Sequence, residues 1–458
     1  MSLFARSGSA QKPVNISRRS FLTAAGMTAI ALPVLAACGS PAGGTASFSA
    51  PDVKAPSEFS GRTNVVIWSP WSGNNHEVFT GVVDGFNRSQ SDIYAEVQQF
   101  NGYDGVTEKI AAGLQARQIP DIGVFSDVSW NKFFLNDTLE PLGGYFDNNF
   151  GPSTFNERLF TEGVVRGESY WIPFGRSTPL FYYNKEIFSS AGLPDRAPAT
   201  WDEFRSWGKQ ISGQNYNGNS LKMRAYTGAD DWYMQGLIWN FGGSISDGLD
   251  VTVDSAAAIA AAEFDRAVIN DDKIAYLAQE INNDFINGQV ATITNSTGSL
   301  TGLIKGAQFE VGAGFLPQQS THGVPTGGAG LGIMKNASPE RKEAAAQVLA
   351  YLSAEEASST WTVGTGYLPS TISAANSTKV RQVMADNPNY KLAVDQLELA
   401  RQPDAVRRYV QSTITEMRTA IQKLYTENAN AEATLKATAT KLRADTDSVR
   451  KLYESKVA

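Results

Sequence analysis

The sequence predicts an α/β protein with two lobes, each a mostly parallel sheet flanked by helices. From Asn64 onward, short apolar strands alternate with segments of helical spacing, and this order implies right-handed crossovers between parallel strands. The alternation pauses at residues 174–185 and then begins again. The chain of 458 residues is also long enough to bury two separate cores.

Residues 1–37 form a predicted export signal that precedes the fold. They carry four basic residues and no acidic residue. The apolar segment 21–37 is interrupted by Gly26 and Pro33, and it is shorter than the ~20 residues that a transmembrane helix needs. The pair Arg18-Arg19 before this segment predicts export by the twin-arginine route, with the general route as the alternative.

The only cysteine of the chain follows directly after this signal. Leu35-Ala-Ala-Cys38 is similar to the cleavage site of bacterial lipoproteins, where an acyl chain such as palmitate is attached after cleavage. A plain secretory signal with an incidental cysteine is the alternative. We therefore expect a protein on the extracytoplasmic face of the cell membrane that touches the membrane through its lipid anchor only.

Composition limits the classes of partner and of stabilising bond. Removal of residues 1–37 changes the formal net charge from −7 to −11, which argues against nucleic acid as a partner. A single cysteine excludes an internal disulfide, so large apolar cores must hold the fold. Residues 38–62 are rich in Ser, Ala, Pro and Gly and predict a lipidated flexible tether.

The beginning of the first lobe predicts three strands and two helices. The strands are expected at 65–68, 94–100 and 121–125, and the helices at 76–87 and 107–117. In open α/β sheets, ligands bind beyond the carboxyl ends of the strands. Residues 68–73, Tyr103 and Asp127 are therefore expected at the rim of this lobe.

The segment 174–185 is the expected passage from the first lobe to the second. Pro179 fixes the backbone before a short apolar and aromatic strand, and the hydroxyl pair Ser177-Thr178 stands at the start of that strand. These hydroxyls are candidates for a ligand contact. An ordinary strand with a polar start is the alternative.

In the second lobe, a helix is expected at 186–191 after the crossing strand, and a further helix is expected to start with Thr200 as its cap, because Glu203 follows at capping-box spacing. Among the aromatic residues of 226–243, Trp239 and Phe241 are assigned to the core. Trp232 follows a polar turn and is expected near the surface of the lobe.

The remainder of the chain contains two candidate ligand loops. The loop 295–300 follows a strand and opens a helix, so it suits either an anion contact or a hydroxyl-rich cap. The chain is expected to return to the first lobe there, with a strand at 309–315, and to cross a third time at 353–361. The glycine-rich loop 325–334 contains no Gly-x-Gly-x-x-Gly, which argues against a dinucleotide site. Residues 414–458 predict amphipathic helix that packs on the second lobe.

An enzyme is the first alternative class. The chain contains only two histidines, His76 and His322, and no cysteine that lipidation leaves free. These counts exclude a cysteine nucleophile and a zinc site built on several His and Cys ligands, but they do not exclude a Ser-His-Asp triad or a carboxylate pair. No cofactor and no metal are expected. An adhesion or signalling lipoprotein is the second alternative class.

Four stretches in the same order carry a resemblance to a known family: 177–185, 295–300, 327–334 and 365–370. They are Ser-Thr-Pro-Leu-Phe-Tyr-Tyr-Asn-Lys, Asn-Ser-Thr-Gly-Ser-Leu, Gly-Gly-Ala-Gly-Leu-Gly-Ile-Met and Thr-Gly-Tyr-Leu-Pro-Ser. Together with the lipoprotein signal, the chain from Asn64 to its end resembles the extracytoplasmic solute-binding proteins of carbohydrate-type ABC importers. Within them it is most similar to the glycerol-3-phosphate and glycerophosphodiester binders.

The resemblance implies a fold like that of maltose-binding protein, with three hinge crossings. Lobe 1 would comprise 63–175 and 299–354, and lobe 2 would comprise 176–298 and 355–458. A monomer would capture sn-glycerol 3-phosphate or a glycerophosphodiester between the lobes and deliver it to an ABC permease without chemistry. An oligosaccharide is the alternative solute, and a secreted hydrolase is a more distant one.

The resemblance also implies a set of ligand-binding residues. They are Tyr103, Asp127, Ser177, Trp232, Thr297, Ser299, Gly328, Tyr367 and Arg407. The indole of Trp232 would pack on glycerol carbons or attract a quaternary ammonium, while Ala229 replaces a second tryptophan of the family. The guanidinium of Arg407 would bind phosphate through two parallel hydrogen bonds. Ser296, Gly327, Arg176 and Arg408 are the alternatives at their respective positions.

Overall fold

The computed structural model describes residues 48–228 and 230–458. The predicted export signal, the lipidation site at Cys38, the first part of the tether and Ala229 lie outside these residues. Within the described part of the chain, no helix has both the length and the apolar character needed to cross a membrane.

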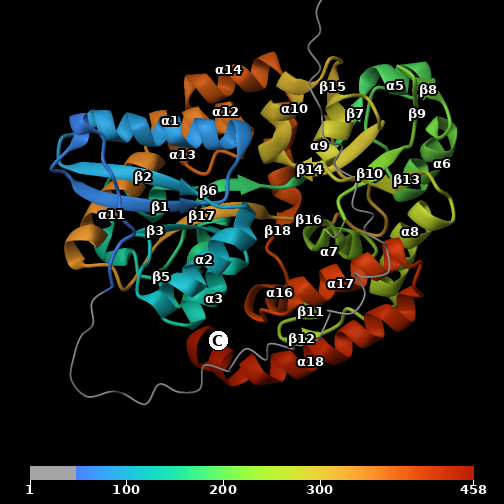
Figure 1. The fold of residues 1–458 in the computed structure, drawn as a ribbon. Helices are drawn as coiled ribbons and strands as arrows, with labels where there is room; N and C mark the ends of the chain where they lie inside the picture. The colour runs from blue at the N-terminus through green and yellow to red at the C-terminus, as the bar shows by residue number, and fades with distance from the viewer. Residues whose placement is uncertain (1–47, 229) are drawn as a thin grey trace, which may run out of the picture. The chain divides into compact units, whose positions relative to one another are not determined.

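The first sheet contains four strands that run in one direction and one reversed strand. Its order is β2 (Ile93–Gln99), β1 (Thr63–Ser69), β3 (Ile122–Ser126), β17 (Gly327–Ile333) and β6 (Ile172–Ser177). β1 pairs in parallel with β2 and β3, whereas β17 pairs antiparallel with both of its neighbours. Helix α1 (Gly73–Ser89) and helix α2 (Gly102–Ala116) cover opposite faces of this sheet (Figure 1).

The second sheet repeats this plan. Its order is β13 (Ala275–Leu277), β10 (Arg224–Tyr226), β14 (Thr292–Ser296), β7 (Pro179–Asn184) and β15 (Val311–Gly314). Here β7 is the reversed strand, because it pairs antiparallel with β14 and β15. The prediction of two mostly parallel sheets flanked by helices is confirmed.

The remaining elements connect and cover the two sheets. The helices are α3 (Ser129–Leu135), α4 (Glu157–Phe160), α5 (Lys185–Ser190), α6 (Trp201–Ile211), α7 (Asp231–Asn240), α8 (Ala256–Asn270), α9 (Ile281–Ile286), α10 (Leu300–Gly306), α11 (Pro339–Ser353), α12 (Glu355–Thr365), α13 (Ile372–Asn376), α14 (Thr378–Asp386), α15 (Pro388–Asp395), α16 (Ala405–Tyr409), α17 (Thr413–Thr426) and α18 (Ala431–Lys456). The short strands are β4 (Val164–Val165), β5 (Glu168–Ser169), β8 (Asn215–Tyr216), β9 (Asn219–Ser220), β11 (Ser246–Asp247), β12 (Asp250–Val251), β16 (Val324–Pro325) and β18 (Ala400–Arg401). Six short 3-10 turns complete the described residues: Ser57–Phe59, Gly143–Tyr145, Pro152–Thr154, Thr161–Gly163, Thr297–Ser299 and Gln396–Leu399. The predicted cap of α6 is confirmed, since the side chain of Thr200 accepts a hydrogen bond from the backbone of Glu203.

The chain passes from the first sheet to the second at Thr178, between β6 and β7. The chain returns to the first sheet at a later residue than expected. The strand expected at 309–315 in the first lobe is β15, which pairs with β7 in the second sheet. Val311 packs there with Leu180 and Tyr182, so apolar burial holds this strand in the second sheet. The return occurs between β16 and β17.

The third crossing also lies later than the expected segment 353–361. Trp361 and Tyr367 belong to the core of the first sheet, where the Trp361 ring stacks on Phe174 at 5.0 Å and on Tyr367 at 5.3 Å between ring centroids. Leu368 is the first residue of this segment in the core around β7 and β14. Aromatic packing therefore keeps α12 with the first sheet.

Two terminal segments differ from their expectations. The tether was expected to extend to residue 62, but Phe59 is buried, and the backbone N–H of Ser49 donates to the carbonyl of Arg117 at 3.0 Å. The helix expected to pack on the second lobe, α18, lies along α8 and α17 there and in addition reaches α3 of the first (Figure 1). There the Lys456 ammonium donates to the carbonyl of Leu135 at 2.8 Å.

Candidate functional site

A cavity of about 330 Å³ lies where strands of both sheets end. Asp127 follows β3, Ser177 ends β6, and Ser296 ends β14, so the carboxyl ends of parallel strands surround the cavity as the topology predicts. Seven of the nine residues proposed from the sequence line it. These are Tyr103, Asp127, Ser177, Trp232, Gly328, Tyr367 and Arg407.

Arg407 is the central cation of the cavity. It lies on α16 and is buried, and its Nε and Nη2 donate to Asp231 Oδ2 at 3.0 Å and 2.7 Å. Its Nη1 lies 3.8 Å from Asp127 Oδ2 and has no hydrogen-bond partner within the described residues. Burial by itself would lower the pKa of Arg407, but the carboxylates of Asp231 and Asp127 outweigh burial and raise it. The guanidinium therefore stays charged, and its Nη1 amino group is left for a ligand.

Two side chains on the opposite wall also end in unpartnered polar atoms. Asp127 Oδ2 and the Tyr103 hydroxyl have no hydrogen-bond partner among the described residues. Burial raises the pKa of both groups, and Arg407 partly offsets the effect at Asp127. A buried polar atom without a partner costs roughly 1–3 kcal/mol, so these atoms are poised for a ligand that supplies the missing hydrogen bonds.

Trp232 packs over the glycine-rich loop at the start of β17. Its Nε1 donates to the carbonyl of Thr326 at 3.0 Å. A Cβ atom on Gly327 would lie 2.6 Å from the indole, and Gly328 has a φ of +85°. The two glycines therefore allow the indole to approach the backbone closely and allow the chain to turn at the cavity wall.

Tyr367 lies deeper than the sequence indicated. The Gly-Tyr-Leu-Pro context suggested an exposed hydroxyl for this residue of the fourth family stretch, but the side chain is buried and the hydroxyl accepts a hydrogen bond from Trp71 Nε1 at 3.1 Å. Trp71, expected at the rim, is part of the first core. The ring of Tyr367 thus forms a fixed wall of the cavity.

Thr297 and Ser299 do not line the cavity. Both belong to the 3-10 turn Thr297–Ser299, and Asn295 and Ser296, which precede this turn, line the cavity in their place. The Ser296 hydroxyl accepts a hydrogen bond from the backbone of Gly298 at 3.0 Å, so it also caps this turn.

The two alternative arginines are held elsewhere. Arg176 is fully buried on β6, forms an ion pair with Glu162, and stacks over Trp171 at 4.9 Å. Arg408 donates to the side chain of Gln402 at 3.0 Å. Neither residue lines the cavity.

Sequence reasoning missed the acidic residues on the second-sheet side of the cavity and Arg418. Asp230 caps α7, and its side chain accepts a hydrogen bond from the backbone of Tyr233 at 3.0 Å; burial raises the pKa of Asp230. The pair Asp230-Asp231 before a helix is the signal that could have found them. Arg418 lies on α17 and donates to both Asp231 and Asp104. Helical periodicity alone gave no reason to single it out.

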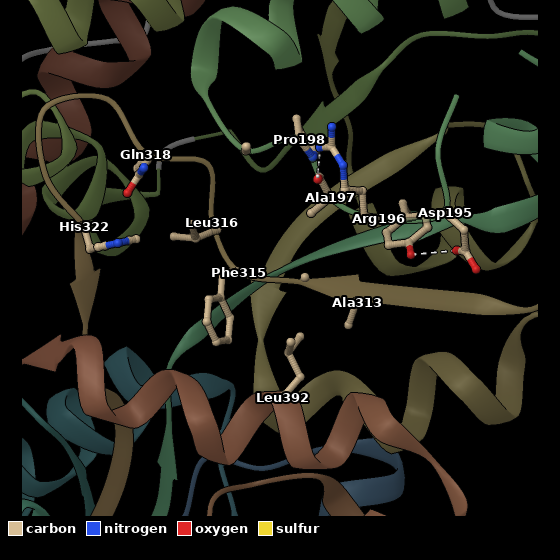
Figure 2. Close-up of a pocket in the computed structure, with 13 residues that line it drawn as sticks. Asp195, Arg196, Ala197, Pro198, Ala313, Phe315, Leu316, Gln318, His322 and Leu392 are labelled. Atoms are coloured by element: carbon tan, nitrogen blue, oxygen red, sulfur yellow. Dashed lines mark hydrogen bonds between the residues drawn. The ribbon is translucent and has the colours of Figure 1, made fainter. Parts of the chain in front are cut away.

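Figure 2 shows another pocket of about 450 Å³ beside β7 and β15. Phe315, Leu316 and Leu392 lie on its apolar side, and Tyr183 donates to Asp195 at 2.8 Å. Among its lining side chains as described, none leaves a buried polar atom without a partner. It therefore lacks the feature that marks the first cavity as a ligand site.

The described residues contain no group of three or more His, Cys, Asp or Glu side chains arranged to hold a metal ion. The side chains that line the first cavity offer hydrogen bonds, ion pairs and aromatic packing. Such a cavity can bind a small polar solute.

Residues 81–391 match the family model described as bacterial extracellular solute-binding protein. The sn-glycerol-3-phosphate-binding periplasmic protein UgpB of Yersinia pestis is 27% identical over 360 residues, which are 73% of this chain and 80% of that protein. The crystal structure of UgpB from Mycobacterium tuberculosis in complex with glycerophosphocholine is 32% identical, with a TM-score of 0.77, and covers 85% of this chain and 99% of that one. The GacH receptor of Streptomyces glaucescens, solved with acarbose, shares the fold at 18% identity and a TM-score of 0.75, covering 84% of this chain and 99% of that one. The chain belongs to the bacterial extracellular solute-binding protein family, as its resemblance indicated.

Proposed function

We propose that this protein captures a glycerophosphodiester, or sn-glycerol 3-phosphate, in the cavity around Arg407 and delivers it to an ABC permease. The observation that carries the proposal is the set of three unpartnered polar atoms in one cavity: Tyr103 Oη, Asp127 Oδ2 and Arg407 Nη1. The names of the UgpB relatives support the same class of solute.

The three atoms match the groups of a glycerol phosphate. A phosphate oxygen accepts a hydrogen bond from Arg407 Nη1, and a glycerol hydroxyl donates to Asp127 Oδ2. The Tyr103 hydroxyl can donate to a phosphate oxygen or accept from a glycerol hydroxyl. Because the guanidinium and the carboxylate lie 3.8 Å apart, one solute can reach both.

The charges of the cavity favour a diester with a cationic head group over a phosphomonoester. Four carboxylates line it, from Asp104, Asp127, Asp230 and Asp231, against the two guanidinium groups of Arg407 and Arg418. Asp231 already accepts hydrogen bonds from both arginines. A dianion therefore meets few free donors, whereas a zwitterion such as glycerophosphocholine offers a cation to the surplus carboxylates.

Trp232 supplies an apolar face for the same solute. Its indole lies against Gly327 at the cavity wall, and an indole face attracts a quaternary ammonium by about 0.5–2 kcal/mol. Glycerol carbons can pack on the same face. The residue thus contributes to either solute, and more to the one that carries a head-group cation.

The site belongs to a transport receptor that does no chemistry on its solute. We propose that the protein acts as a monomer, that a lipid on Cys38 anchors it outside the membrane, and that export follows the twin-arginine route. The two sheets and their connections form lobes that close over the solute. Cys38→Ala should release the protein from membranes or block its maturation, and fractionation that leaves the variant wholly membrane-bound would contradict the anchor.

Calorimetric titration with glycerophosphocholine, sn-glycerol 3-phosphate and maltose tests the solute. We expect saturable binding of glycerophosphocholine, weaker binding of glycerol 3-phosphate, and no heat from maltose. Arg408→Ala is the matched control, because this neighbouring arginine lies outside the cavity. Binding of maltose alone would favour the oligosaccharide alternative. No heat of binding from any of the three solutes would contradict the proposed solute class.

A further inference from the structure

Five charged side chains form a continuous chain across the cavity, in the order Asp104, Arg418, Asp231, Arg407 and Asp127. Arg418 Nη1 donates to Asp104 Oδ2 at 2.7 Å, and its Nε donates to Asp231 Oδ1 at 2.9 Å. The other oxygen of Asp231 accepts from Arg407 at 2.7 Å. The last step, from Arg407 Nη1 to Asp127 Oδ2, spans 3.8 Å.

Asp104 and Asp127 belong to the first half of the molecule, whereas Asp231 and Arg418 belong to the second. Asp104 lies in the first turn of α2 and Asp127 follows β3, and both elements pack in the first half of the molecule. Asp231 opens α7, and Arg418 lies on α17, two helices that pack against each other beside the second sheet. The Asp104–Arg418 end therefore joins the two halves across the cavity, whereas Arg407 lies on α16, which contacts both α3 and α17.

The inner and outer links of the chain differ in exposure. The side chains of Arg407 and Asp231 are 5% and 4% exposed, so their ion pair is fixed inside the protein. The side chains of Arg418 and Asp104 are 43% and 66% exposed. An exposed ion pair contributes little stability and is screened by salt, so the outer link can open and close at low cost.

We propose that Arg418 is a positioning residue that also acts as a clasp between the lobes. Through Nε it holds Asp231, and Asp231 in turn orients the Arg407 guanidinium. Through Nη1 it makes a reversible bridge to Asp104, directly beside Tyr103. Opening of the cleft breaks this bridge, so Arg418 biases the lobes toward closure and slows release of the solute.

The proposed clasp predicts a property of the unliganded protein, so it can be tested whatever the identity of the solute. Small-angle X-ray scattering of the unliganded protein should show a larger radius of gyration for Arg418→Gln and for Asp104→Asn than for the parent. Raising the salt concentration should expand the parent but leave Arg418→Gln nearly unchanged. Equal radii and equal salt responses would overturn the clasp, whatever solute the protein binds.

Arg443→Gln is the matched control for this substitution. Arg443 also forms a forked pair, with Asp254 at 2.7 Å and 3.0 Å, and its side chain is 49% exposed. Both partners belong to the second half of the molecule, on α18 and before α8. Its loss should leave the radius of gyration unchanged.

Stopped-flow kinetics with glycerophosphocholine test the effect on release, and this arm depends on the proposed function. Arg418→Gln should raise the dissociation rate about two- to fivefold, the range expected for one exposed ion pair, with a smaller change in the association rate. Arg418→Lys should rescue only part of the effect, because an ammonium lacks the fork that reaches both carboxylates. An unchanged dissociation rate in a parent that binds glycerophosphocholine would overturn the role of Arg418, whereas a parent that does not bind it would contradict the proposed solute instead.

Discussion

The two walls of the cavity are built in different ways. On the wall that belongs to the first core, Tyr103 and Asp127 end in buried atoms without partners. On the opposite wall, Asp230 caps a helix, Trp232 donates to a backbone carbonyl, and Asp231 joins two arginines. The second wall is thus held together before the solute arrives, with Arg407 Nη1 as its one unpartnered group among the described residues, whereas both polar ends of the first wall await the solute.

This difference separates two kinds of mutational effect. Residues of the assembled wall support one another, so their loss should reduce both stability and affinity. Residues of the incomplete wall cost stability in the free protein, because an unpaired buried polar atom is unfavourable by roughly 1–3 kcal/mol. Their removal should reduce affinity alone.

Arg407→Ala should have the largest effect. It removes the proposed donor for the phosphate and leaves the buried Asp231 with Arg418 as its one remaining arginine partner among the described residues, and breaking a buried ion pair costs about 3–5 kcal/mol. We expect affinity for glycerophosphocholine to fall more than about 100-fold and the melting temperature to fall as well. Calorimetry and thermal unfolding check both, and a variant with parental affinity would show that the assembled wall is not a recognition surface.

Tyr103→Phe should separate affinity from stability. The substitution removes a buried hydroxyl that has no partner in the free protein, so we expect unchanged or slightly higher stability. The loss of one ligand hydrogen bond should weaken binding about tenfold. Equal losses of stability and affinity would place Tyr103 in the assembled wall and erase the contrast between the walls.

The pH dependence of binding should report on Asp127. Burial raises the pKa of this carboxyl, so protonation begins at a higher pH than for an ordinary aspartate, and affinity should fall as the pH falls through that raised value. The stability of the free protein depends on pH in the opposite direction. The contribution of Asp127 to stability is greatest below its ordinary pKa and is lost as the pH rises through the raised one. Asp127→Asn should bind weakly with a flatter pH profile, and a variant that keeps the parental profile would exclude Asp127 as the responsible group.

Trp232→Leu should have the smallest effect. It removes the indole face but keeps an apolar side chain, so affinity for glycerophosphocholine should fall about two- to fivefold. Binding of sn-glycerol 3-phosphate should change less, because that solute has no cationic group. Equal losses for the two solutes, measured by calorimetry, would assign the indole to the glycerol carbons.

Much of the fold followed from local patterns in the sequence. Apolar runs and helical spacing predicted the strands and helices before Asp127, and the carboxyl-end rule placed Tyr103 and Asp127 at one site. The later crossings were misplaced because they depend on packing between distant segments. Val311 stays with Leu180 and Tyr182, and Trp361 stays with Phe174, and neither contact has a local signal.

The site was predicted less completely than the fold, for a similar reason. The resemblance supplied Trp232 and Arg407, and both line the cavity. It also pointed to Thr297 and Ser299, which lie in a 3-10 turn outside the cavity, while Asn295 and Ser296 before this turn line the wall. Asp231 and Arg418 were missed because an ion network between helices far apart in the chain leaves no pattern in the sequence.

A crystal structure of the protein with glycerophosphocholine tests the central claim most directly. We predict that the phosphate accepts a hydrogen bond from Arg407 Nη1, that a glycerol hydroxyl donates to Asp127, and that the choline group lies against Trp232. The Tyr103 hydroxyl should gain a partner in the same complex. Electron density for the solute in the pocket of Figure 2, or a complex that leaves Tyr103 and Asp127 without partners, would contradict it.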